Sequence, residues 1–311
     1  MNLSHLDLGE TLPLSPMAGL CASHHLFDKN QVAAIMTAWH AKRPLLVRGD
    51  PGLGKSQLAH AIAQSQNWNL LVHVVNSRTE PEDLLYKVDH VARLAKAQLV
   101  HQEVASPNSL AEENFVVPGP LWWAYAPAQA QAFFDSAAND YKTSLAINGD
   151  RPSVLLIDEI DKADSELPNA LLEVLNNHSF HAHGHDQPVT SEADKRPFVV
   201  ITSNDQRQLP PAFLRRCVCL ELTMKKGQEG VQQLTTIAMA HKPDLEHLSD
   251  EVVAKAAELV IDKRDSCIAG EYAPGTSEFL DLLKVLNSEL YPNDDARLLG
   301  LDEIKDYILE K

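Results

Sequence analysis

The sequence has little of several features that define specialised classes of protein. It has four cysteines in 311 residues and no CxxC spacing, which argues against a disulfide scaffold or a cysteine-based metal site. Glycine (13) and proline (18) are too few for a collagen-like or low-complexity chain. There is no run of 18 apolar residues and no charged-then-apolar leader. We therefore expect a reduced, cytoplasmic protein with no membrane partner.

Positive charge is also scarce. The 27 lysines and arginines are outnumbered by 43 aspartates and glutamates, which gives a formal net charge of −16 and makes a nucleic-acid partner unfavourable. Acidic residues are concentrated in residues 227–311, which carry 18 of the 43 aspartates and glutamates. Hydrophobic residues at 44% and charged residues at 23% are typical of globular proteins. The chain is thus expected to fold with a second, smaller and more acidic unit at its C-terminal end.

Short apolar runs alternate with helical patterns over the first 226 residues. The runs predicted to be buried strands are Leu45–Val47, Leu70–Val75, Val154–Ile157, Phe198–Thr202 and Val218–Leu222. After Gly227 only helical patterns follow, at about 230–241, 249–262, 276–290 and 302–309. This order predicts an α/β fold, in which helices cover both faces of a parallel sheet, followed by a small all-helical domain. The expected divisions are an N-terminal arm at 1–28, an α/β domain at 29–226 and a helical domain at 227–311.

Two segments of the α/β region are harder to interpret. Residues Pro81–Val100 are predicted to form one helix, with Leu84, Leu85, Val88, Val91 and Leu94 on its apolar face. Trp122, Trp123 and Tyr125 follow a Pro-Gly-Pro turn, and burial in a core and contact with a partner are equally consistent with that pattern.

The first predicted strand runs directly into a glycine-rich loop. Its sequence is Gly49-Asp50-Pro51-Gly52-Leu53-Gly54-Lys55-Ser56, followed by Gln57, and it matches the GxxxxGK[ST] pattern with a strand before it and a helix after it. Such a loop directs backbone N–H groups and a helix N-terminus at phosphate oxygens. We expect these nine residues to bind a nucleotide, with Lys55 reaching the β- and γ-phosphates and Ser56 offering its hydroxyl to Mg²⁺.

The third predicted strand ends in two carboxylates, Asp158 and Glu159. The carboxyl edge of a parallel sheet is where α/β proteins bind ligands, so both side chains are expected near the phosphate loop. Asp158 is predicted to hold Mg²⁺ through water and Glu159 to polarise the attacking water. Asp161 and Asp164 are interpreted as caps of the following helix.

Together these residues resemble the AAA+ ATPases. The segment Asp158–Ala163 resembles their extended Walker B motif, Val199–Asn204 their sensor 1 segment, and Leu209–Arg216 their arginine-finger segment. The resemblance implies the AAA+ form of the P-loop NTPase fold, with ATP and Mg²⁺ as nucleotide and ion. It also implies that Asn204 positions water and that Arg216 is the finger. Arg215 is the second candidate for the finger, because two arginines stand where many relatives have an acid before a single arginine.

Within AAA+ proteins the sequence is most similar to the MoxR group. Three segments carry this similarity: Arg43–Leu46, Val117–Trp123 and Thr276–Leu280. It implies a homo-oligomeric ring, of hexameric size, that remodels or activates a protein client, often a von Willebrand factor A-domain protein. The lids of this group often carry a sensor 2 arginine, whereas Pro274–Glu278 contains no basic residue. How the lid senses the γ-phosphate is therefore left open.

Four histidines, at positions 178, 181, 183 and 185, lie between the Walker B and sensor 1 segments. The last three alternate, so a strand would bring them to one face, which is compatible with a metal site. An exposed hairpin tip is the favoured interpretation, because the surroundings are polar. In an AAA+ ring this hairpin would face the pore.

Two other functions compete with a protein-remodelling ATPase. One is a nucleic-acid motor or restriction-type NTPase subunit, which the net charge and the lack of a basic stripe disfavour. The other is a nucleotide-gated scaffold with slow turnover. The presence of Lys55, Asp158, Glu159 and Asn204 argues against a scaffold, and the missing sensor 2 arginine argues slightly for one.

Overall fold

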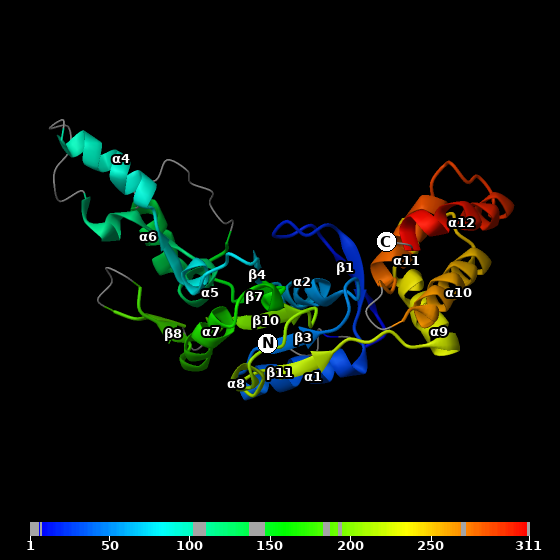
Figure 1. Cartoon of the computed structure of the whole chain (residues 1–311), viewed down its shortest axis with the longest axis horizontal. Coiled ribbons are helices and arrows are strands. Elements are labelled where there is room, and N and C mark those ends of the chain that lie inside the picture. The colour runs from blue at the N-terminus through cyan, green and yellow to red at the C-terminus, as the bar shows by residue number, and fades with distance from the viewer. Residues whose placement is uncertain are drawn as a thin grey trace.

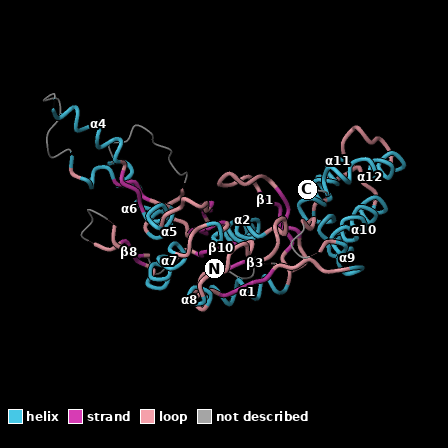
Figure 2. Tube along the Cα trace, in the orientation of Figure 1, coloured by secondary structure: helices cyan, strands magenta, loops and turns pink. Residues whose placement is uncertain are grey.

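The computed structural model describes residues 6, 8–101, 110–136, 147–182, 187–191, 195–268 and 272–309. Figure 1 shows an elongated molecule with a sheet at its centre. Helix α4 (His90–His101) lies at one end of the long axis, and the helices from α9 (Gly227–Ala240) to α12 (Asp294–Leu309) lie at the other. Among the described residues, Figure 2 shows strands only in the part of the chain before α9.

The central sheet has five parallel strands in the order β11-β3-β10-β7-β4. Their bounds are β3 (Leu45–Arg48), β4 (Asn69–Val74), β7 (Ser153–Asp158), β10 (Phe198–Ser203) and β11 (Val218–Glu221). All five predicted strands are therefore confirmed. Because the strands are parallel, all their carboxyl ends meet at one edge of the sheet.

Helices cover both faces of this sheet, as predicted. Leu45 and Val47 point into the core beneath α1 (Lys29–Ala41) and α2 (Lys55–Gln66), whereas Leu46 belongs to the opposite core. Successive residues of a strand point to opposite faces, so an unbroken apolar run suits a strand buried on both sides. The α/β class with a parallel sheet follows from this pattern.

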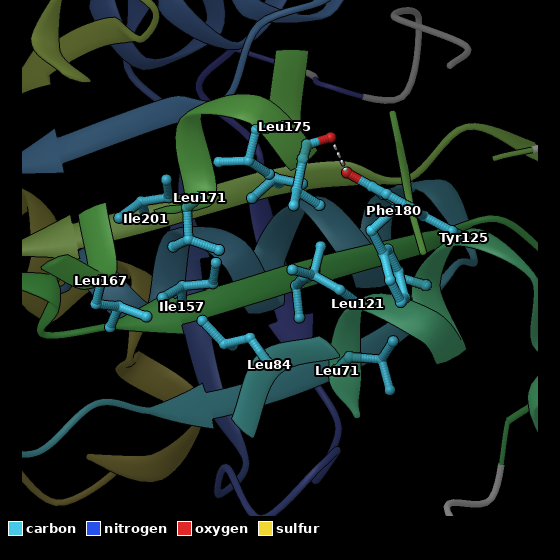
Figure 3. Packing of buried hydrophobic residues seen from close by; sticks show 14 of the residues in the cluster. Leu71, Leu84, Leu121, Tyr125, Ile157, Leu167, Leu171, Leu175, Phe180 and Ile201 are labelled. Atoms are coloured by element: carbon cyan, nitrogen blue, oxygen red, sulfur yellow. Dashed lines mark hydrogen bonds between the residues drawn. The ribbon is translucent and has the colours of Figure 1, made fainter. Parts of the chain in front are cut away.

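The second core lies beneath α7 (Glu166–Asn177), close to α5 (Pro120–Tyr125) and α6 (Pro127–Ser136). Figure 3 shows Leu167, Leu171 and Leu175, spaced four apart on α7, facing residues of β7 and β10. The Tyr125 hydroxyl donates a hydrogen bond to the Val174 carbonyl at 3.2 Å, so its polar atom is satisfied in the core.

The aromatic cluster after the Pro-Gly-Pro turn belongs to this core. Trp122, Trp123 and Tyr125 are at most 3% exposed. Burial in a core is thus the correct explanation of these residues.

The single helix predicted over Pro81–Val100 is wrong. The segment forms α3 (Pro81–Leu85), then strand β5 (Tyr86–Val88), then α4, and β5 pairs antiparallel with β6 (Val116–Pro118). Val91 and Leu94, expected on an apolar face, are 80% and 65% exposed. The pairing with a segment about 30 residues away supplies backbone hydrogen bonds that override the local helical pattern.

The N-terminal arm folds into a hairpin of β1 (Thr11–Leu14) and β2 (Ser23–Leu26), which packs on α2. A second hairpin, of β8 (Ser179–Phe180) and β9 (Val189–Thr190), carries the histidine-rich segment. In that segment His178 is half-buried and His181 is exposed, whereas His183 and His185 lie outside the described residues.

The C-terminal region is helical and has its own hydrophobic core. It consists of α9, α10 (Asp250–Ser266), α11 (Thr276–Leu286) and α12, with a short turn η6 (Lys242–Asp244) after α9. Leu53 at the tip of the phosphate loop packs against this core. Among the described residues, no helix is long and apolar enough to cross a membrane.

Candidate nucleotide-binding site

A cavity of about 290 Å³ opens at the carboxyl edge of the sheet. It is lined by the phosphate loop, by the ends of β7 and β10, and by the start of α11. The lining residues are Pro51, Gly52, Gly54, Lys55, Ser56, Gln57, Asp158, Glu159, Thr202, Asn204 and Ser277. The structure therefore brings the predicted loop, Walker B and sensor 1 residues together around one space.

The phosphate loop requires glycine at Gly49, and its backbone conformation favours glycine at Gly54. Gly49 has φ 144°, and a Cβ there would lie 2.3 Å from the Leu222 carbonyl oxygen. Gly54 has φ 83° and immediately precedes α2, so the N-terminus of that helix faces the cavity. Substitution of Gly49 by any other residue would push the loop away from β11.

Lys55 is buried and its ammonium group is satisfied within the loop. Its Nζ donates to the carbonyl oxygens of Gly49 and Asp50, both at 2.8 Å. Burial lowers the pKa of Lys55, and the negative charge of Asp158 partly opposes that shift. The cation is therefore held at the cavity wall, where a phosphate oxygen can replace the carbonyl contacts.

Asp158 is bound by hydroxyl groups from two other elements. Ser56 Oγ donates to both carboxylate oxygens, at 2.8 and 2.9 Å, and Thr202 Oγ1 donates to Oδ1 at 2.5 Å. Thr202 reaches this position because β10 lies between β3 and β7 in the sheet. Thr202 was not among the predicted site residues, although its place near the end of the sensor 1 strand could have indicated it.

Glu159 is oriented by three contacts. Its backbone has φ 61°, a left-handed conformation, and its N–H donates to Thr202 Oγ1 at 2.8 Å. Its carboxylate accepts from Asn204 Nδ2 at 3.2 Å and from Lys162 Nζ at 2.5 Å. The contact with Glu159 raises the pKa of Lys162. The side chain is 27% exposed, so Glu159 lies at the border between cavity and solvent.

Asp161 is not a helix cap. It is 1% exposed, and its two carboxylate oxygens accept hydrogen bonds from the backbone N–H groups of Asn204 (3.1 Å) and Gln206 (3.0 Å). Asp164 also does not cap through its side chain, which pairs with Arg207 at 2.8 Å. The short η4 turn (Ile160–Lys162) directs Asp161 inward, and its buried carboxylate positions the loop that carries Asn204.

Besides the packing of Leu53, two residues of the helical C-terminal region make polar contacts with the phosphate loop. The backbone N–H and Oγ of Ser277 contact the Gly52 carbonyl oxygen at 3.1 and 3.3 Å. Arg264, on α10, forms an ion pair with Asp50 and donates to the carbonyls of Ala273 (3.2 Å) and Pro274 (3.0 Å). Its side chain is 13% exposed. No motif pointed to Arg264, which lies more than 200 residues from Asp50 in sequence.

The two finger candidates lie at the other edge of the sheet. They follow α8 (Pro211–Leu214) and precede β11, whose first residue pairs in register with Leu45 at the start of β3. The four residues of β3 separate that edge from the phosphate loop by about 13 Å, at about 3.3 Å per residue. Arg215 and Arg216 are therefore not brought to the cavity of their own chain.

Both arginines are exposed. Arg216 Nη1 donates to the Ala212 carbonyl at 3.3 Å, and the Arg215 carbonyl accepts from Arg43 at 3.3 Å. Within the described part of the chain, neither guanidinium has a carboxylate within 4.0 Å.

Two solved structures from Thermotoga maritima are similar to this chain. No curated protein matches the chain. A mutant of RuvB from Thermotoga maritima is similar in structure, with 18% identity, a TM-score of 0.50, and coverage of 89% of this chain and 68% of that chain. A second Thermotoga maritima structure, described as the RuvB Holliday junction branch migration motor, gives 18% identity, a TM-score of 0.45, and coverage of 89% and 67%.

Residues 44–217 match the model of the AAA domain family, dynein-related subfamily. This span is more than half of the 311 residues and runs from the start of β3 to the finger candidates. It therefore contains the phosphate loop, the Walker B strand and the sensor 1 strand. The chain belongs to the AAA domain family, dynein-related subfamily.

Proposed function

We propose that this chain is an ATP-hydrolysing ring protein of MoxR type that remodels or activates a protein partner. The observation that carries the proposal is the convergence of Lys55, Ser56, Asp158, Glu159 and Asn204 on one cavity. Phosphoryl transfer needs little covalent chemistry from the protein. It needs positioning and charge neutralisation, which these groups can supply.

Nucleotide binding is assigned to residues Gly49 to Gln57. The loop backbone and the N-terminus of α2 receive the phosphates, and the Lys55 ammonium moves from the loop carbonyls to the β- and γ-phosphate oxygens. That exchange needs little movement, because the carbonyls belong to the same loop.

The residues also fit a magnesium ion. Ser56 Oγ and the Asp158 carboxylate lie within hydrogen-bond distance of each other and are hard oxygen donors, the type that Mg²⁺ prefers. When bound, the ion would neutralise charge on the β- and γ-phosphates. Thr202 keeps the Asp158 carboxylate in its orientation.

Glu159 is assigned as the carboxylate that orients the attacking water, and Asn204 as the residue that fixes that carboxylate and positions the water. Both side chains line the cavity and contact each other. Lys162 also binds the Glu159 carboxylate. Glu159 must therefore orient water while it is paired with Lys162, or the ion pair must break first.

Arg216 is assigned as a finger that acts on the nucleotide of a neighbouring subunit, with Arg215 as the second candidate. Its position at the far edge of the sheet supports action between subunits, which a closed ring of identical chains provides. We further propose a hexamer, a von Willebrand factor A-domain protein as client, a cytoplasmic location and no nucleic-acid substrate. The division into residues 1–28, 29–226 and 227–311, with the last as a lid, is part of this proposal.

The experiment that tests the proposal is phosphate release from ATP measured over a wide range of chain concentration, with and without Mg²⁺. Turnover per chain should rise as the chain assembles, and it should require Mg²⁺. Turnover that is independent of chain concentration would contradict the ring. Tight ATP binding without turnover at any concentration would favour the nucleotide-gated scaffold. Stimulation by DNA or RNA would favour the nucleic-acid motor.

A further inference from the structure

Three metal-ligating side chains lie together where the N-terminal arm meets the helical C-terminal region. His24 comes from β2, His241 follows α9, and Asp244 ends the η6 turn. Their donor atoms all lie within 4.8 Å of one another. This is a different place from the nucleotide cavity, whose lining contains none of the three.

Local structure explains why two of the three share one side. His241 and Asp244 are three residues apart, and the Asp244 N–H donates to the His241 carbonyl at 2.9 Å. Side chains three apart in a 3₁₀ turn eclipse each other, so the ring and the carboxylate point the same way. The turn is fixed in place by Asn287, whose Nδ2 donates to the Asp244 carbonyl at 3.2 Å.

The spacing of the donors suits a small ion. His24 Nδ1 lies 3.2 Å from Asp244 Oδ2. Two ligands about 2.0–2.2 Å from a tetrahedral zinc ion are about 3.3–3.6 Å apart, so this pair is already close to the right separation. His241 completes the set with a shift of its side chain of about 1.5 Å at most, the difference between the widest spacing and the ideal one.

The state of the histidine rings also points to a ligand. His24 Nδ1 is a fully buried atom, and among the described residues it has no hydrogen-bond partner, although Asp244 Oδ2 lies 3.2 Å away. Buried polar atoms in proteins are normally satisfied, so an orphaned ring nitrogen beside two other donors calls for a partner. The two rings meet edge to face, with centroids 5.3 Å apart.

The His241 ring is buried as well. His241 is 6% exposed, whereas Asp244 is exposed, so the three donors meet where the interior opens to solvent.

The geometry points to a transition-metal site, of the zinc class, formed by His24, His241 and Asp244, with water as the fourth ligand. Two imidazoles and one carboxylate are the donors that zinc takes in sites with an open position. The ion would tie the helical region to the arm.

That tie would also reach the nucleotide site. Gln57, which lines the cavity, donates to Ser23 Oγ at 2.7 Å and to the His24 carbonyl at 3.3 Å. A metal on the His24 ring therefore fastens the helical region to a strand that is already bonded to α2. The inference does not depend on the proposed ATPase function, because it concerns metal binding to the chain alone.

The test uses the full chain with His181, His183 and His185 replaced by Gln, so that the histidine-rich hairpin does not bind the probe. Without added nucleotide, the chain is titrated with Zn²⁺ alone by calorimetry and with Co²⁺ alone by visible absorption. We expect one ion per chain and the intense visible bands of tetrahedral Co²⁺. Asp244→Asn and His24→Gln should each weaken Zn²⁺ binding at least tenfold. Zn²⁺ should raise the thermal midpoint of the parent chain and not that of Asp244→Asn.

Matched controls lie in the same segment. Glu246→Gln and His247→Gln change exposed residues that are not part of the cluster and should leave Zn²⁺ affinity unchanged. If His24→Gln fails to fold, as shown by loss of a cooperative thermal transition, Asp244→Asn decides, because Asp244 is exposed. Absence of a 1:1 ion in the parent chain, or unchanged affinity in Asp244→Asn, overturns the inference.

Discussion

The two edges of the central sheet present opposite kinds of chemistry. At the carboxyl edge every ionisable group around the cavity is engaged: Lys55 by loop carbonyls, Asp158 by two hydroxyls, and Glu159 by Asn204 and Lys162. At the amino edge Arg216 is exposed, and among the described residues its guanidinium donates to a backbone carbonyl. At one edge the charged side chains are held by their neighbours, and at the other, within the described residues, the Arg216 guanidinium has no carboxylate partner.

This difference indicates how the two edges are used. Negative charge develops on the γ-phosphoryl group as it is transferred. Among the described residues, Lys55 is the only cation that lines the cavity, so the cavity can neutralise only part of that charge. The cation at the amino edge cannot reach that charge in its own chain, because the strands of the sheet lie between them. The two edges are therefore expected to meet between subunits, and variants at each edge can separate their contributions.

Arg216→Ala tests the amino edge and should have the largest effect. We expect turnover to fall by about 10³ or more, with nucleotide affinity nearly unchanged, because a finger stabilises charge that develops only in the transition state. Arg215→Ala is the matched control and should show a smaller defect. Steady-state phosphate release and nucleotide titration measure both. An equal loss of nucleotide affinity would instead mean that the arginine supports the fold or the ground state.

Mixing subunits tests whether the edges meet. Arg216→Ala chains carry an intact cavity, and Glu159→Gln chains carry an intact finger. At some interfaces between the two kinds of chain, an intact finger therefore faces an intact cavity. Partial recovery of turnover is expected when the two inactive preparations are combined and reassembled. No recovery at any ratio would show that catalysis is completed within one chain.

Glu159→Gln tests the carboxyl edge. The amide keeps the shape of the side chain and loses the charge that orients water, so turnover should fall about 10²-fold or more while ATP stays bound. Glu166→Gln, an exposed change on α7, is the control and should behave as the parent. A loss within tenfold, about 1.4 kcal/mol of barrier, would show that Glu159 is not the catalytic carboxylate.

Lys55→Ala tests binding at the same edge. Removal of the buried ammonium should raise the Kd for ATP at least hundredfold, about 2.7 kcal/mol. Because burial lowers the pKa of Lys55, the parent chain should lose ATP affinity as the pH rises, beginning below the ordinary lysine value of 10.5. Equilibrium titration against pH measures both effects. An affinity in Lys55→Ala equal to that of the parent would refute the phosphate-loop assignment.

Arg264→Gln tests the contact between the helical region and the phosphate loop, and its effect should be smaller. We expect KM for ATP to rise about tenfold with kcat little changed, because Arg264 acts as a positioning residue through Asp50. Asp50→Asn should behave in the same way. The loss of ATP affinity in the double variant, in free energy, should be smaller than the sum of the two single losses. Arg264→Lys should restore part of the affinity, and Lys255→Gln on the same helix is the control. Additive losses would show that the ion pair does not transmit the effect.

The sequence by itself determined the features that depend on neighbouring residues. Short stretches of consecutive residues define the phosphate loop, the Asp158-Glu159 pair and the five buried strands. Loop glycines and unbroken apolar runs determine local structure within such stretches, and the confirmed fold class follows from them. Ring size, client and the MoxR assignment stay predictions.

The tertiary structure alone decided the contacts between distant segments. Thr202 reaches Asp158 across 44 residues, Asp161 turns inward to hold the sensor 1 loop, and Arg264 reaches Asp50 across 214 residues. The break of the Pro81–Val100 pattern by the β5–β6 pairing is of the same kind. In each case the partner that stabilises the side chain or the backbone comes from another element, so its energy depends on the order and packing of the strands and is absent from any local pattern.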